Sequence, residues 1–286
     1  MLKRISVLLS SLIVAACGST SSPPPVKPSK PAPVIGLALG GGASKGFAHI
    51  GVIKVLKEAG IPVKIVTGTS AGAVVGSMYA SGMSPDRLEL EAEIMNKADV
   101  IDFALSFKGL IKGEKLAQYI NVKTKQQLMQ NYPIKFGAVA TDFSTGKMVV
   151  FNKGKAGQAV RASASIPNVF QPATISGRQY VDGGLVAPVP VSAARQLGAT
   201  KVIAVDITAK PSKNKGDGFW SYLDQSLNIM NTTALNNELA KADVVIRPNV
   251  LSMGAVSGFD QKKEAIELGE KAARAALPRI RALLAQ

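Results

Sequence analysis

The sequence predicts an α/β domain in which a mainly parallel central sheet is flanked by helices on both faces. Short apolar runs that suit buried strands alternate along the chain with longer segments whose apolar residues recur at helical spacing. Strands that alternate with helices become parallel neighbours covered on both faces, which gives a three-layer sandwich. With 286 residues, 47% of them hydrophobic, the chain is long enough for one mid-sized core.

In the first half of the domain, each expected element is bounded by glycine or proline. Residues 34–39 are a short apolar strand, and residues 47–60 are a helix that stops at Gly60. Residues 63–66 form a second strand before a small-residue helix that ends near residue 81. A third helix begins with Ser84 as N-cap and Pro85 at its first position.

The second half continues the alternation and adds two hairpins. Residues 134–151 suit two strands around a Ser-Thr-Gly turn, and residues 171–185 suit a hairpin around Gly177. The remaining expected elements are helix 156–166, helix 190–198, strand 201–207, helix 221–242, strand 243–248 and a last helix from about 261, broken or kinked near Pro278.

The N-terminus has the features of a lipoprotein leader. A basic start is followed by a brief apolar run and then by "VAAC", which resembles a bacterial lipobox ending at Cys17. Residues 1–16 are then a signal peptide, and Cys17 is acylated after cleavage. The alternative is an ordinary signal peptide with a chance cysteine. Residues 17–33 are rich in Ser and Pro and suit an extended tether before the domain at residues 34–286.

The leader and the charge together predict where the protein works. A lipid-anchored protein belongs to the cell envelope, on the periplasmic face. Gly18, rather than an acidic residue, favours the outer membrane if the host is Gram-negative. A formal net charge of +15 suits anionic partners. The chain has no zinc-finger spacing and no arginine-rich run, so a membrane surface is favoured over nucleic acid.

The stretch "GTSAG" at residues 68–72 is the candidate nucleophile. It places Ser70 between a strand run and a helix run, as a nucleophile elbow requires. The alternative is a glycine-rich turn with an idle serine.

A serine needs a base, and the usual triad is excluded here. The single histidine, His49, precedes Ser70 and lies within a helix, where a structural role, packed or half exposed, suits it better. The remaining candidates are carboxylates that follow strand runs. Asp182 stands out because Gly183 and Gly184 let the chain turn sharply beside it. Asp142 suits a side chain that supports a turn, and Asp206 suits a cap or structural group at the end of a strand.

The glycine loop at residues 40–46 precedes a helix. Its amides suit either a phosphate cradle or an oxyanion hole, although the stretch matches neither standard phosphate-binding pattern. A tight structural turn is the third interpretation. With one histidine and one cysteine the chain cannot build a usual zinc site, and no metal or other cofactor is expected.

Three motifs in order resemble the patatin-like phospholipases: Gly-Gly-Gly-x-x-Lys-Gly at residues 40–46, "GTSAG" at 68–72 and Asp-Gly-Gly at 182–184. "ASASIPNVFQP" at residues 162–172 resembles the segment of that family between the elbow and the aspartate. The resemblance covers the chain from residue 34 to about residue 207.

The resemblance implies a lipid acyl hydrolase that uses a Ser70–Asp182 dyad and no histidine. It implies Gly41 and Gly42 as oxyanion donors. The supporting motif residues are Gly40, Lys45, Gly46, Gly68, Gly72, Gly183 and Gly184. Lys45 suits loop support, attraction of a lipid head group, or a solvated surface position.

The substrate follows as a phospholipid or another acyl-ester lipid. The alternative is a non-catalytic envelope lipoprotein that binds a lipid or a partner in the same cleft. Residues 83–132 are expected to form either a cap over the acyl pocket or ordinary core. Their apolar residues stand in an irregular order, at Phe103, Leu105, Phe107, Leu110 and Ile111.

Overall fold

The computed structural model describes residues 32–103, 109–208, 218–253 and 257–285. Within it, Pro33–Gln286 form one compact unit. The signal peptide, Cys17 and almost all of the tether lie outside the described residues and stay predictions.

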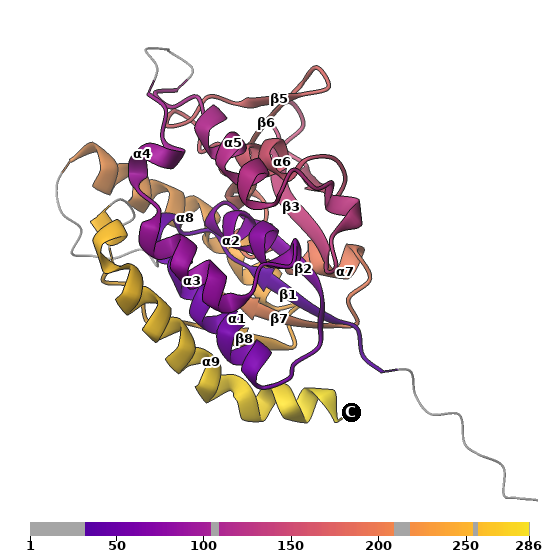
Figure 1. Ribbon diagram of the computed structural model, residues 1–286. Coiled ribbons are helices and arrows are strands. Elements are labelled where there is room, and N and C mark those ends of the chain that lie inside the picture. The colour runs from indigo at the N-terminus through magenta and orange to yellow at the C-terminus, as the bar shows by residue number, and fades with distance from the viewer. Residues whose placement is uncertain (1–31, 104–108, 209–217, 254–256, 286) are drawn as a thin grey trace, which may run out of the picture. The chain divides into compact units, whose positions relative to one another are not determined.

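One sheet lies at the centre of this unit (Figure 1). Its strands are β1 (Ile35–Leu39), β2 (Val63–Thr69), β3 (Lys135–Asp142), β4 (Met148–Phe151), β5 (Ala173–Ile175), β6 (Arg178–Asp182), β7 (Lys201–Val205) and β8 (Val244–Ile246). The order is β5-β6-β3-β2-β1-β7-β8, with β4 paired to β3. The run β3-β2-β1-β7-β8 is parallel, and the pairs β3-β4, β3-β6 and β5-β6 are antiparallel.

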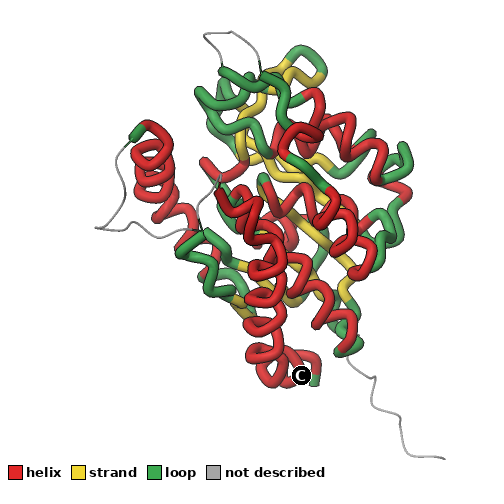
Figure 2. Tube along the Cα trace, turned by 60° about the vertical axis from the view of Figure 1, so that its left-hand side comes forward, coloured by secondary structure: helices red, strands yellow, loops and turns green. Residues whose placement is uncertain are grey.

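The helices are α1 (Ala48–Glu58), α2 (Ala71–Ala80), α3 (Pro85–Ile94), α4 (Lys97–Val100), α5 (Glu114–Lys123), α6 (Ala156–Ser163), α7 (Val191–Gln196), α8 (Phe219–Leu239) and α9 (Lys262–Leu284). Figure 2 shows the strands enclosed among these helices. The predicted fold class, a mainly parallel sheet with helices on both faces, is confirmed.

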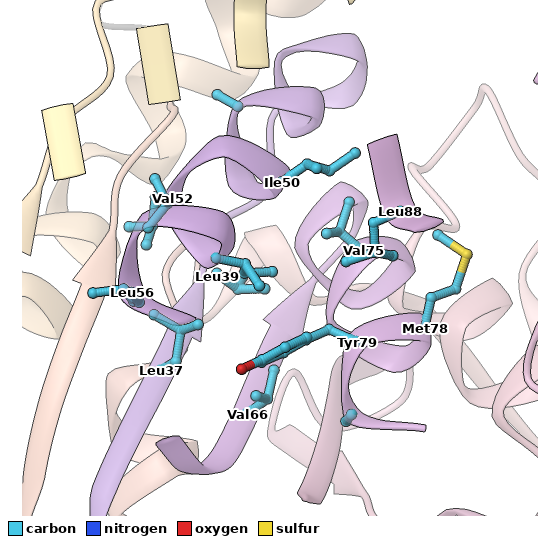
Figure 3. Close-up of a cluster of buried hydrophobic side chains, with 14 of the residues drawn as sticks. Leu37, Leu39, Ile50, Val52, Leu56, Val66, Val75, Met78, Tyr79 and Leu88 are labelled. Carbon is cyan, nitrogen blue, oxygen red and sulfur yellow. The ribbon is translucent and has the colours of Figure 1, made fainter. Parts of the chain in front are cut away.

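Alternate residues of the central strands face two different helical layers. Leu37 and Leu39 of β1 pack with α1 and α2, where Ile50 and Val75 line the same core (Figure 3). Ala38 between them faces the other way, toward α7 and α8. Both faces of these strands are covered, which explains their continuous apolar runs.

Three sequence expectations need correction. The predicted helix at residues 47–60 is preceded by a 3-10 turn, η1 (Ala43–Phe47), and α1 ends at Glu58. Strand β2 runs three residues beyond its predicted end, to Thr69. Helix α9 continues through Pro278, so of the predicted break or kink the break is wrong.

The segment predicted as a cap or as core is partly buried and partly exposed. Helices α3 and α5 bury Leu88, Leu116 and Ile120 in the main core. Phe103 is 80% exposed and Leu110 is 45% exposed, while Ile111 is buried. Leu105 and Phe107 lie outside the described residues. The core interpretation therefore holds for α3 and α5.

Candidate active site

Ser70 occupies a strained turn between β2 and α2. Its backbone angles are φ 52° and ψ −120°, a region that side-chain-bearing residues avoid. The flanking glycines permit this turn. A Cβ on Gly68 would lie 2.3 Å from the Gly72 carbonyl oxygen, and one on Gly72 would lie 2.1 Å from that of Leu39. The predicted elbow is therefore present.

The strand register brings Asp182 to Ser70. Strand β2 pairs along β3 as far as Thr69 opposite Val139, and β4 pairs across the other edge at the same level. Strand β6 pairs with β3 further along, where Asp182 lies opposite Ala140 and Tyr180 lies opposite Asp142. Strand β4 still occupies the other edge of β3 at Ala140. Strands β2 and β6 therefore approach each other end to end along one edge of β3. The residues at their ends become neighbours although 112 positions separate them in sequence.

Two threonines of β2 fix the segment that follows Asp182. The Thr69 hydroxyl donates to the Ala187 carbonyl at 2.8 Å, and the Thr67 hydroxyl donates to the Pro190 carbonyl at 2.9 Å. Both threonines are fully buried. Sequence reasoning missed them, although the signal was present: a hydroxyl in a buried strand must find a partner.

Asp182 is a buried carboxylate with one engaged oxygen. Oδ1 accepts from the Gly184 amide at 2.6 Å, while Oδ2 is buried and accepts no well-aligned hydrogen bond. The Ser70 hydroxyl lies close enough to favour the charged form of Asp182. The sharp turn after Asp182 requires glycine, because a Cβ on Gly183 would lie 2.2 Å from the Val139 carbonyl oxygen.

Burial controls the ionisation of this carboxylate. Desolvation raises the pKa of Asp182 to about 6, against the smaller opposing effects of the Gly184 and Ser70 hydrogen bonds. At neutral pH the group is ionised and still basic enough to accept a proton.

The glycine loop lies against the nucleophile. A Cβ on Gly41 would lie 3.3 Å from Ser70 Cβ, and one on Gly46 would lie 2.6 Å from Ala71 Cβ. The Gly41 amide donates to the Pro188 carbonyl at 2.9 Å. Within the described residues, the Gly42 amide has no such partner. Of the two predicted oxyanion donors, Gly42 is thus the one left open in this conformation.

His49 supports this loop from inside the fold. It is fully buried on α1, and its Nε2 donates to the Gly40 carbonyl at 2.8 Å. Burial lowers the pKa of His49 to about 4, so the ring is neutral at neutral pH. Of the packed and half-exposed positions predicted for His49, the packed one fits. Lys45 is only 3% exposed, which excludes the solvated alternative and leaves loop support as the better interpretation.

The rival carboxylates are engaged elsewhere. Asp142 Oδ1 accepts from the amides of Ser144 and Thr145 and so supports the β3–β4 turn. Asp206, just after β7, accepts from Thr208 and pairs with Arg247 at 3.3 Å. Neither touches Ser70.

The described residues hold no group of three or more His, Cys, Asp or Glu side chains placed to bind a metal ion. None of their helices is long and apolar enough to cross a membrane.

Comparison with known proteins decides the family. The sequence profile described as "Patatin-like phospholipase" matches residues 37–195, more than half of the chain and both the Ser70 and the Asp182 motifs. The chain belongs to the patatin-like phospholipase family. The resemblance that the sequence motifs predicted is confirmed.

Relatives of this patatin-like chain occur in bacteria and animals. An uncharacterised NTE family protein of Mycobacterium tuberculosis is 33% identical over 207 residues, which cover 71% of this chain and 58% of the relative. A patatin-like phospholipase domain-containing protein of Caenorhabditis elegans is 30% identical, over 85% of this chain and 20% of its own length. The matches thus span less than two thirds of these relatives.

Solved structures share the fold at low sequence identity. VipD from Legionella pneumophila superposes with a TM-score of 0.61 at 14% identity, over 88% of this chain and 67% of VipD. The type III effector protein ExoU gives 0.52 at 15% identity, over 87% of this chain and 54% of ExoU. These likenesses concern the patatin-like architecture alone.

Proposed function

We propose that the chain is a serine lipid acyl hydrolase that works through a Ser70–Asp182 dyad. The observation that carries this proposal is the buried Asp182 carboxylate, which lies close to the Ser70 hydroxyl and has one oxygen, Oδ2, that is buried without a hydrogen-bond partner. The Gly184 amide occupies Oδ1, so Oδ2 is the atom left to take the serine proton. Membership in the patatin-like phospholipase family supports a lipid ester as substrate.

In the proposed first half-reaction, Ser70 Oγ attacks the ester carbonyl carbon while its proton passes to Asp182 Oδ2. The carbonyl oxygen gains negative charge, which amides of the glycine loop stabilise. The Gly42 amide is open for this, whereas the Gly41 amide must share or release its bond to Pro188. The Ala71 amide, in the first turn of α2 directly after the nucleophile, is a third candidate donor.

The following steps complete the acylation and then return the enzyme to its starting state. The intermediate expels the alcohol, which takes the proton from Asp182, and an acyl-serine remains. Asp182 then removes a proton from water, the resulting hydroxide attacks the acyl carbon, and the fatty acid leaves as Ser70 regains its proton.

A fluorophosphonate probe tests this proposal against a non-catalytic lipid- or partner-binding lipoprotein. We expect one adduct per molecule, located on the peptide that contains Ser70, and no adduct on the Ser70→Ala variant. A folded wild-type protein that stays unlabelled would favour the binding protein. Labelling at a different serine would contradict the assignment of the nucleophile.

We further propose that Cys17 carries a lipid anchor that holds the enzyme on an envelope membrane, aided by the basic charge of the chain. The support is the lipobox-like sequence before Cys17 and the net charge of +15. In the native host, Cys17→Ser is expected to abolish incorporation of labelled palmitate and to shift the protein from the membrane fraction to the soluble fraction. Unchanged palmitate incorporation would contradict the anchor.

A further inference from the structure

The hydroxyl of Ser163 lies between the nucleophile elbow and the sheet. Ser163 ends α6 and is fully buried. Its Oγ accepts from the Ser70 amide at 3.0 Å and donates to the Val139 carbonyl at 2.5 Å. Since the carbonyl can only accept, the hydroxyl hydrogen points to Val139 and a lone pair faces the Ser70 amide. The hydroxyl thus replaces a ladder hydrogen bond where β2 leaves β3.

This contact acts on a strained residue. The φ of 52° at Ser70 has a cost that only its surroundings can offset. The hydrogen bond that the Ser70 amide donates to Ser163 Oγ holds the Ser70 backbone, and with it the direction of the Ser70 side chain, in that conformation. Without this acceptor, a buried N–H group would lose its partner, and the elbow could relax toward a less strained turn.

The same short segment also holds the other half of the dyad. The Ser165 carbonyl accepts from the Asp182 amide at 2.9 Å. Residues 163–165 therefore bind the amides of both Ser70 and Asp182, and their spacing helps to set the separation of the two side chains.

On the basis of the proposed function, we propose that Ser163 is a positioning residue that aims the Ser70 hydroxyl at Asp182 through the Ser70 amide. It needs no contact with substrate. The resemblance of residues 162–172 to the family pattern does not say what this segment does. The two hydrogen bonds of Ser163 indicate a role in positioning Ser70.

Three variants separate hydrogen bonding from packing. Ser163→Ala removes the hydroxyl. Ser163→Cys nearly keeps the volume but puts a poor acceptor in its place. Ser77→Ala is the matched control, because Ser77 is equally buried and its hydroxyl donates to the Val74 carbonyl of its own helix. Each is assayed on a soluble short-chain nitrophenyl ester, with active sites counted by the fluorophosphonate and folding checked by thermal melts.

Both Ser163 variants are expected to lose about 10- to 100-fold in kcat per titrated site, with KM changed less than about threefold, since small misplacements of a nucleophile are costly. Ser77→Ala should match the wild type. If Ser163→Ala fails to fold, kcat per titrated site of Ser163→Cys tests the inference instead.

Full kcat per titrated site in the Ser163 variants, or an equal loss in Ser77→Ala, would overturn the inference while leaving the proposed function intact. A wild-type protein that neither turns over nor labels would overturn both.

Discussion

Asp182→Asn is expected to remove at least about 1,000-fold of the turnover and at the same time to stabilise the fold. The activity falls because an amide cannot take the proton of Ser70, and general-base catalysis contributes on the order of 100- to 10,000-fold. Asparagine keeps an oxygen for the Gly184 amide that now bonds Asp182 Oδ1 at 2.6 Å. The active-site geometry should therefore survive while the chemistry is lost.

The gain in stability follows from the raised pKa of Asp182, which is about 6 in the fold against an ordinary value of 3.8. Between these values the folded state binds the proton and the unfolded state does not, so wild-type stability falls as pH rises, and the full cost is present above pH 6. The variant has no such cost. We expect it to be more stable than wild type by about 3 kcal/mol at pH 8 and by about 1 kcal/mol at pH 4.5.

Urea unfolding at the two pH values measures this difference directly, and the pH profile of the wild type checks the same carboxylate. The acid limb of kcat/KM should be half-maximal near pH 6. An equal stability difference at both pH values would contradict the buried charge, and a fully active variant would contradict the base.

Gly72→Ala is expected to destabilise the protein by about 3 kcal/mol and to remove most of its activity. The new Cβ would lie 2.1 Å from the Leu39 carbonyl oxygen and 2.8 Å from that of Gly40. Both atoms are backbone, so the end of β1 or the start of α2 must move. Because Gly40 begins the glycine loop, the shift also displaces the oxyanion donors from Ser70.

Gly76→Ala in the same helix is the matched control. Its Cβ would meet only side-chain atoms, Val66 Cγ1 at 3.0 Å and Leu39 Cδ1 at 3.3 Å. Alanine favours a helix over glycine by about 1 kcal/mol, which should offset this crowding. Thermal or urea unfolding of both variants, with the ester assay, makes the comparison. Equal effects of the two substitutions would contradict the close approach at Gly72.

The parts of the fold that the sequence predicted are those that depend on local signals. Apolar periodicity and turn residues located the central strands, both hairpins and the elbow at Ser70. The predicted end of β2 is too early because Thr67 and Thr69 are polar residues, which a buried strand rarely contains. Their hydroxyls donate to carbonyls more than 100 positions away in the sequence. Helix α5 was not predicted, since its apolar residues follow an irregular segment.

Other features depend on contacts that no local pattern records. Pro278 suggests a broken helix, yet the burial of Ala273, Ala276 and Ile280 against the core offsets the lost hydrogen bond. The meeting of β2 and β6 on one edge of β3 is a matter of register between distant strands. Ser70 and Asp182 could be chosen from their motifs, but not the hydroxyl of Ser163 that joins the elbow to the sheet.

Whether Ser70 carries out ester hydrolysis can be decided by comparing the wild type with one variant. The wild-type chain and its Ser70→Ala variant are assayed together on mixed phospholipid micelles and on a short-chain nitrophenyl ester, with matched thermal melts. We predict fatty-acid release by the wild type and a loss of at least about 10,000-fold in an equally folded variant. Hydrolysis that persists at the wild-type rate in Ser70→Ala would contradict the dyad and the function proposed for it.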